Sequence, residues 1–219
     1  MSLVAGKRLV LALTISMLAA SCSPAVDIQD SVARIEATAC NRATVGSAFA
    51  VETDLLMTNA HVLAGVESDI GVVTPDGEIH TGVVEAFDPL LDIALVRVAG
   101  LDAVPVTFAA SIVGDVGFIG AVVKDGVVTP VSHTVLRHIV ANSGDIYDQG
   151  VVSRPAVELR AAIDPGTSGA AVFDELGRVI GLAFAENRND DITYAIGQEL
   201  LADFLAEPRA SSDTGRCRR

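Results

Sequence analysis

The chain has 219 residues, of which 50% are apolar and 20% charged, and its formal net charge at pH 7 is −13. This composition is typical of a compact globular protein with a large apolar core, and it excludes a disordered chain. The acidic balance argues against sequence-independent binding of nucleic acid, which needs Lys and Arg side chains against the phosphates.

Residues 1–26 predict an export signal, as a signal peptide or a lipoprotein signal. Two basic residues precede an apolar segment, 9–20, that is too short to span a bilayer unaided. Small residues then lead to Cys22, as in a bacterial lipobox, which would lipidate Cys22 and anchor the chain in a membrane. Because Leu18 stands four places before this cysteine and not three, plain secretion after Ala25 and an uncleaved anchor stay open. All three outcomes predict export to the cell envelope (lipid-anchored or periplasmic) or secretion.

Short segments rich in β-branched residues alternate with turn signals along most of the remaining chain, which predicts an all-β barrel or sandwich. Aromatic residues make up only 4%, so we expect the core to consist of Val, Ile, Leu and Ala. The expected strands are 32–38, 45–51, 55–57, 69–74, 79–87 and 93–98, then 104–107, 116–123, 127–136, 151–152, 157–163, 170–173, 179–185 and 193–195.

The two groups of strands predict two six-stranded Greek-key β-barrels side by side, separated by a break around residues 100–111. We assign 27–100 to the N-terminal barrel and 101–207 to the C-terminal barrel. The second assignment includes a short helix over 198–206, where apolar residues recur at helical spacing. Residues 208–219 are polar and are expected to form a flexible tail.

Three polar residues stand at the ends of predicted strands. His61 lies in a short turn after a strand, Asp92 opens an apolar strand, and Ser168 lies on a glycine-flanked bend before a buried strand. Each residue alone would usually be structural. A serine hydroxyl is a weak nucleophile that needs a base, and the chain order His, Asp, Ser matches that of the chymotrypsin triad.

Three segments resemble the signature motifs of the trypsin-like (chymotrypsin-fold) serine proteases: 58–62 (Thr-Asn-Ala-His-Val), 92–96 (Asp-Ile-Ala-Leu-Val) and 166–169 (Gly-Thr-Ser-Gly). They are most similar to the bacterial Deg/HtrA branch and to the periplasmic acid-resistance proteases of actinobacteria, over about residues 35–205. The length leaves no room for the PDZ domain that many Deg proteases carry.

The resemblance implies an exported serine endopeptidase that acts through an acyl-enzyme. Ser168 would attack the peptide carbonyl, His61 would move its proton, and Asp92 would orient His61. The N–H groups of Gly166 and Ser168 would form the oxyanion hole. The family pattern places the primary substrate pocket at Ala162, Ile163, Leu182, Ala183 and Phe184. No carboxylate lies among them, so we expect small or medium apolar side chains to be preferred.

Two positions depart from the family pattern. Thr167 stands where digestive relatives have the Asp that pairs with a new N-terminus, so activity could depend on ordering of the polar loop 143–150 instead. Ala170 replaces the second glycine after the serine and adds a methyl group near the bend. The alternative function is therefore a catalytically silent chymotrypsin-fold protein that binds peptides in the cell envelope.

The three cysteines leave one pair, Cys40 and Cys217, if Cys22 is lipidated or removed. In an oxidising compartment this pair can form a disulfide, worth roughly 4–5 kcal/mol in the chain-entropy model. The acid-resistance protease family has a similar bridge, and two free thiols are the alternative.

No metal or other cofactor is expected. The four histidines, His61, His80, His133 and His138, show no ligand spacing, and the cysteines are not clustered. The expected partners are polypeptide substrates, with no nucleic acid and with membrane anchoring only through Cys22. The sequence does not predict an oligomeric state.

Overall fold

The computed structural model describes residues 27–122, 127–208 and 211–218. The predicted export signal and Cys22 lie outside these ranges. Within them, no helix is both long enough and apolar enough to cross a membrane.

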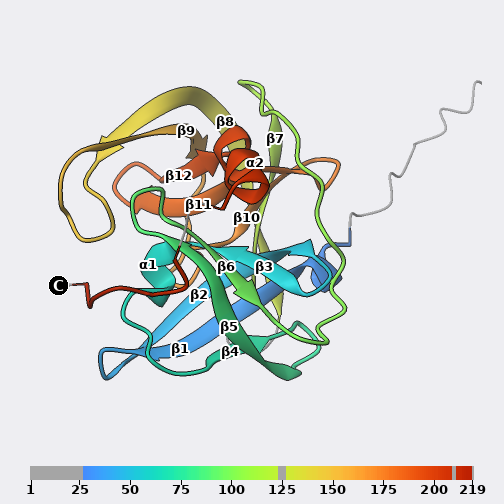
Figure 1. The fold of residues 1–219 in the computed structure, drawn as a ribbon. Helices are drawn as coiled ribbons and strands as arrows, with labels where there is room; N and C mark the ends of the chain where they lie inside the picture. The colour runs from blue at the N-terminus through green and yellow to red at the C-terminus, as the bar shows by residue number, and fades with distance from the viewer. Residues whose placement is uncertain (1–26, 123–126, 209–210, 219) are drawn as a thin grey trace, which may run out of the picture.

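The first six strands close into an antiparallel barrel (Figure 1). Their order around the barrel is β1-β2-β3-β6-β5-β4, and the ring closes because β4 pairs with β1. This non-sequential order is a Greek-key arrangement. The strands are β1 (Val32–Ala39), β2 (Arg42–Glu52), β3 (Leu55–Thr58), β4 (Ile70–Val73), β5 (Ile79–Asp88) and β6 (Ile93–Arg97).

The second six strands form another closed antiparallel barrel, in the order β10-β11-β12-β9-β8-β7. It stands above the first barrel in Figure 1. The strands are β7 (Val116–Val122), β8 (Val128–Ser143), β9 (Val152–Arg160), β10 (Ala171–Asp174), β11 (Val179–Asn187) and β12 (Ile192–Gly197). The predicted double Greek-key barrel is thus confirmed, although single strands differ.

Three of the expected strands form differently. Segment 104–107 has no strand of its own and links the barrels instead: Val106 N–H donates to Ala50 O, and Val179 N–H donates to Thr107 O. The segments predicted separately at 151–152 and 157–163 are represented by one strand, β9, which runs from Val152 through Pro155 and ends at Arg160. Proline is tolerated there because β9 pairs only with β8 at this point and meets β12 from Ala156 onward.

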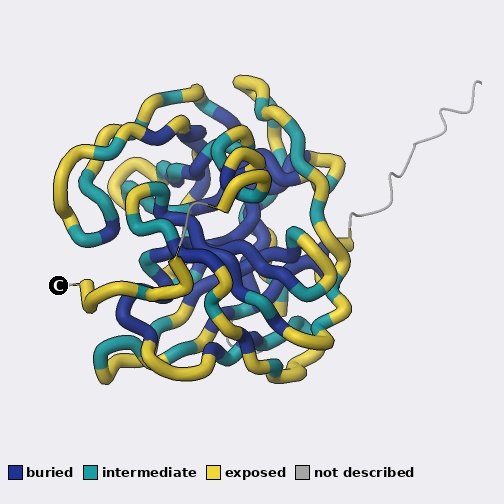
Figure 2. Tube along the Cα trace, in the orientation of Figure 1, coloured by how far each residue is buried: buried dark blue, intermediate teal, exposed yellow. Residues whose placement is uncertain are grey.

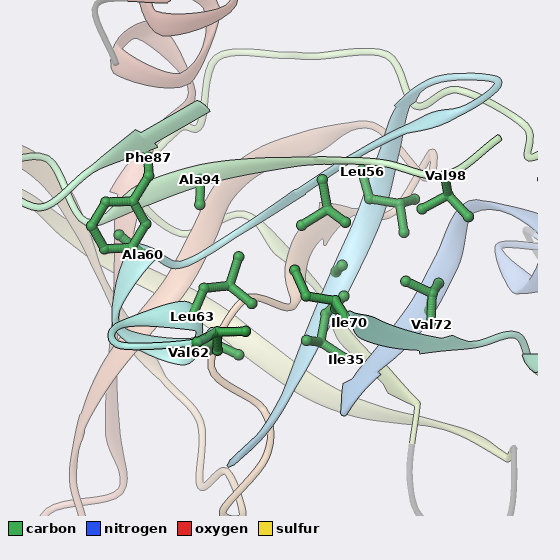
Figure 3. Packing of buried hydrophobic residues seen from close by; sticks show 14 of the residues in the cluster. Ile35, Leu56, Ala60, Val62, Leu63, Ile70, Val72, Phe87, Ala94 and Val98 are labelled. Atoms are coloured by element: carbon green, nitrogen blue, oxygen red, sulfur yellow. The ribbon is translucent and has the colours of Figure 1, made fainter. Parts of the chain in front are cut away.

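Three apolar clusters hold the molecule together. One fills the first barrel, as Figure 3 shows for Ile35, Leu56 and Ile70. A second fills the other barrel. The third joins side chains of both barrels, including Phe49 and Phe173, and Figure 2 shows buried chain concentrated where the barrels meet. Burial on this scale fixes the two barrels against each other.

Helices are few in the described part of the chain: η1 (Gln29–Ser31), α1 (Ala60–Leu63) and α2 (Gln198–Ala206). The predicted C-terminal helix is confirmed as α2. Its buried residues Leu201 and Phe204 belong to the cluster between the barrels, so this helix caps the second barrel through one apolar face.

The predicted disulfide joins Cys40 to Cys217. It fixes residues 211–218, which we call the C-terminal strap, and the strap runs beside the turn after α1 (Figure 1). Gly65 N–H donates to Thr214 O at 3.1 Å, and Thr214 Oγ1 donates to Val66 O at 2.8 Å. Polar composition alone favours a flexible tail over 208–219, but these bonds and the bridge restrain its described part.

Removing the bridge should destabilise the fold. We expect the double variant Cys40→Ser/Cys217→Ser to lose about 4–5 kcal/mol of unfolding free energy, because the unfolded chain is no longer cross-linked. Urea unfolding measures the loss, and reduced wild-type protein is the control. Equal urea midpoints for oxidised wild type and the double variant would contradict this stabilising role.

His133 should make stability depend on pH. It lies in β8, is only 3% exposed, and its Nε2 lies 2.8 Å from Phe173 O, while its buried Nδ1 has no partner in the described part of the chain. Burial lowers the pKa of His133 below its usual 6.5. Above pH 6.5 the residue is neutral in both states. Below pH 6.5, His133 becomes protonated in the unfolded chain at a higher pH than in the folded chain. Stability therefore falls as the pH drops toward the folded-state pKa of His133.

We therefore expect wild type to lose more unfolding free energy between pH 8 and pH 5.5 than His133→Gln, which cannot titrate. His138→Gln is the matched control, since His138 is exposed. Urea titrations at both pH values measure this, and identical losses in wild type and His133→Gln would refute the assignment.

Candidate active site

The short helix α1 presents His61 outward. Its neighbours Ala60, Val62 and Leu63 are buried in the cluster of the first barrel, and Figure 3 shows Val62 and Leu63 side by side in it. Because three of the four residues in this turn face the core, His61 is the one left half-buried at the surface. Its side chain is 16% exposed.

His61 is held by Asp92 through three contacts. His61 Nδ1 lies 2.9 Å from Asp92 Oδ2 and 3.1 Å from Oδ1, and the backbone N–H of His61 donates to Oδ1 at 2.9 Å. A carboxylate can only accept, so this pairing places the ring proton on Nδ1 and leaves Nε2 as a free acceptor. Nε2 can therefore act as a base.

Asp92 is itself fixed by its backbone. It is 4% exposed and has a positive φ of 61°, a conformation that Asp tolerates better than most residues. Its N–H donates to Asp88 O at 3.0 Å, and its carbonyl accepts from Asn59 Nδ2 at 3.0 Å. Asn59 precedes α1, so its amide ties the segment that carries His61 to the residue that orients it.

Ser168 follows a turn whose shape is set by two residues. Thr167 N–H donates to Asp164 O at 3.1 Å, and Gly166, at the third position of this turn, has φ of 97°. Proline at the second position and glycine with positive φ at the third are the signature of a type II turn. The turn fixes the direction of the Gly166 N–H.

The amides near Ser168 are available to a ligand. Neither Gly166 N–H nor Ser168 N–H donates to any acceptor among the described residues. Two unpaired N–H groups two residues apart on one bend can stabilise a negative oxygen if they converge. The Ser168 hydroxyl makes no hydrogen bond to His61, and such bonds often tighten only when a substrate is bound.

Ser47 of β2 connects the bend to the histidine segment. Its N–H donates to Ser168 O at 2.8 Å and its hydroxyl donates to Gly166 O at 2.9 Å. Its carbonyl accepts from Thr58 Oγ1 at 2.7 Å, three residues before His61. One fully buried serine of the first barrel thus holds the bend of the second barrel beside the residues that carry His61.

The residues predicted to line the substrate pocket differ in exposure. Leu182 and Ala183 are completely buried in the apolar clusters. Ala162 is exposed, and Ile163 and Phe184 are half-buried. If the pocket lies where the sequence predicts, these three present its accessible side chains.

Neither departure from the family motif disturbs the bend. Thr167 is 5% exposed and forms the turn described above. Ala170 is fully buried in the second barrel with Ile119 and Leu159, so its methyl group points into that core.

The polar loop 143–150 is ordered against the first barrel. Ile146 N–H donates to Pro89 O at 3.1 Å, and Ile146 is buried in the first barrel's cluster. Tyr147 Oη donates to Thr214 O of the C-terminal strap at 3.2 Å. Loop 143–150 therefore lies next to the turn that leads to Asp92.

No cluster of three potential metal ligands occurs in the ranges that the structure describes.

Sequence reasoning missed two residues of this site, Ser47 and Asn59. Asn59 could have been singled out because it lies within the histidine motif. Ser47 carries no local signal, since its partners lie far away in the sequence.

Comparison with known proteins identifies the family of this chain. Residues 46–182 match the family model of the trypsin-like peptidase domain. The serine protease Rv3671c of Mycobacterium tuberculosis H37Rv is 32% identical over 194 residues, which is 85% of this chain and 48% of that protein. The chain thus spans about half the length of the curated relatives that it matches.

Solved structures of the same relative are also similar. The active form of the Rv3671c protease superposes with a TM-score of 0.80 at 28% identity, covering 87% of each chain. Its inactive form gives 0.72 at 26% identity, covering 83% of this chain and 90% of the other. The arrangement of this chain is therefore more similar to the active form than to the inactive one.

The close approach of Gly169 to Ser47 should make any side chain at position 169 destabilising. A Cβ on Gly169 would overlap Ser47 O and Thr58 Oγ1, and its φ is 88°. Gly77 has the same φ with open space around it, so Gly77→Ala measures backbone strain alone, roughly 1–2 kcal/mol. We expect Gly169→Ala to cost about 1–3 kcal/mol more in urea unfolding, because the overlap adds to the strain. Equal losses of unfolding free energy in Gly169→Ala and Gly77→Ala would show that Ser47 and Thr58 move aside without cost.

Proposed function

We propose, because this chain belongs to the trypsin-like peptidase family and to its Deg/HtrA branch, that it is an exported serine endopeptidase. The observation that carries the proposal is the His61–Asp92 pair, positioned beside the Ser168 bend through Ser47. A base with a fixed tautomer next to a serine is the arrangement that nucleophilic acyl transfer requires.

In the proposed reaction Ser168 Oγ attacks the carbonyl carbon of a peptide bond. His61 Nε2 takes the hydroxyl proton and later donates it to the leaving amine, while Asp92 holds the ring and stabilises the imidazolium. Water, activated by His61, then hydrolyses the acyl-enzyme. The N–H groups of Gly166 and Ser168 would stabilise the oxyanion in both steps.

The proposed location is the cell envelope or the outside of the cell. Support comes from the basic and apolar segments before Cys22 and from the Cys40–Cys217 disulfide, which forms readily in an oxidising compartment. Whether Cys22 carries a lipid is part of the same proposal and would be decided by mass spectrometry of the mature protein.

The proposed primary specificity is for small or medium apolar side chains. Ala162 is exposed and carries no charge that could select Lys or Arg. The nearest carboxylate, Asp164, begins the type II turn and is exposed to solvent.

Replacing the nucleophile should abolish hydrolysis without changing the fold. We expect Ser168→Ala to lower the rate of cleavage of unfolded casein roughly a thousandfold or more, because no acyl-enzyme can form. A fluorophosphonate probe should label wild type at Ser168 in a 1:1 ratio and should leave the variant unlabelled. Circular dichroism of both proteins is the control for folding.

If wild type binds unfolded casein but neither cleaves it nor reacts with the probe, the alternative of a catalytically silent peptide-binding protein is correct. Undiminished cleavage by Ser168→Ala would place the chemistry elsewhere in the molecule.

A further inference from the structure

Arg154 is a buried cation with no counter-ion among the residues that the structure describes. It lies in β9 and is 3% exposed. None of the ion pairs between described residues includes it. Within the described ranges both of its hydrogen bonds come from Nη2, at 2.6 Å to Ser143 Oγ and 3.0 Å to Gly144 O, and its buried Nε finds no acceptor there.

Phe184 provides the other contact of this guanidinium. The Arg154 Cζ lies 5.5 Å from the centre of the Phe184 ring, within the range of a cation–π interaction. Burying a charge costs several kcal/mol, and neither a ring face nor two neutral acceptors replaces an anion. The surroundings of Arg154 are therefore short of negative charge.

The groups that contact the guanidinium reach the surface. Ser143 is exposed, and Gly144 and Phe184 are half-buried. Phe184 follows Ala183, whose carbonyl accepts from Gly169 N–H at 3.0 Å, next to Ser168. A peptide lying across the Ser168 bend would thus bring a side chain within reach of Phe184 and Arg154.

We propose that Arg154 determines specificity by binding a carboxylate side chain, Asp or Glu, of the polypeptide substrate at a subsite that borders the apolar primary pocket and shares Phe184 with it. This inference rests on the proposed peptidase function. The carboxylate would accept hydrogen bonds from the unpaired side of the guanidinium, and charge-assisted bonds of this kind are stronger than neutral ones.

The net charge of the protein excludes one other source of a preference for acidic side chains. A chain with a formal charge of −13 repels acidic peptides at long range, so its overall field cannot produce a preference for Glu. Any such preference must come from a local cation. Arg160, on the same strand but exposed, is a matched control, because its removal changes the net charge equally without touching the subsite.

The test uses fluorescence-quenched peptides built on one sequence that wild type cleaves. Each carries Glu, Gln or Lys at one position, from four before the cleaved bond to two after it. We expect one position at which wild type prefers Glu to Gln roughly 10- to 100-fold in kcat/KM, the range of a hydrogen bond to a charged group. Arg154→Met should bring this ratio close to 1, and Arg160→Met should keep it.

Three results would overturn the proposal. Wild type could show no preference for Glu at any position. The preference could persist in Arg154→Met. Arg154→Met could also slow the Glu, Gln and Lys peptides equally, which would mean that Arg154 only anchors the loop at Ser143 and Gly144. If thermal melting shows that Arg154→Met is unfolded, the neutral variant Arg154→Gln replaces it, and an unchanged Glu to Gln ratio in that variant counts against the proposal.

A separate binding measurement tests the subsite if the protein is not a peptidase. If wild type cleaves nothing, fluorescein-labelled Glu and Gln peptides are titrated into Ser168→Ala and followed by anisotropy. Tighter binding of the Glu peptide that is lost in Ser168→Ala/Arg154→Met would support the subsite while hydrolysis is rejected. Equal binding of both peptides would reject the subsite.

Discussion

The site depends on one buried residue that bonds across two barrels. Ser47 uses its N–H, hydroxyl and carbonyl to hold Ser168, Gly166 and Thr58. Each bond is worth only about 1 kcal/mol, but each would leave a buried polar group unsatisfied if broken. The bend and the histidine segment, which lie far apart in the sequence, therefore have one mutual position of low energy.

Other parts of the fold stabilise the position of the Ser168 bend relative to the segment that carries His61. The apolar cluster between the barrels, with Phe49 and Phe173, resists their separation. The C-terminal strap, fixed by the disulfide, bonds to the turn after α1 and to loop 143–150. Loop 143–150 reaches Pro89, just before Asp92, on one side and covers Arg154 on the other. Loop 143–150 thus contacts both the segment that leads to the proposed catalytic Asp92 and the proposed acidic subsite.

Local patterns were enough to predict much of this. Alternating apolar residues predicted both barrels, helical spacing predicted α2, and chain order with motif resemblance brought His61 and Asp92 together as the structure has them. Contacts between distant segments could not be predicted in this way. Ser47, and Arg154 stacked on Phe184, have no local pattern, and their roles follow only from the folded arrangement.

The most direct measurement is a crystal structure of the protein with a peptidyl phosphonate bound covalently to Ser168. We expect His61 Nε2 at about 2.6–3.2 Å from the phosphonyl ester oxygen. We also expect a phosphonyl oxygen that accepts from the N–H groups of Gly166 and Ser168, with the Ser47 bonds intact. A bound phosphonate with the His61 ring turned away, or with the Ser47 bonds broken, would show that Ser47 does not hold the catalytic residues in place.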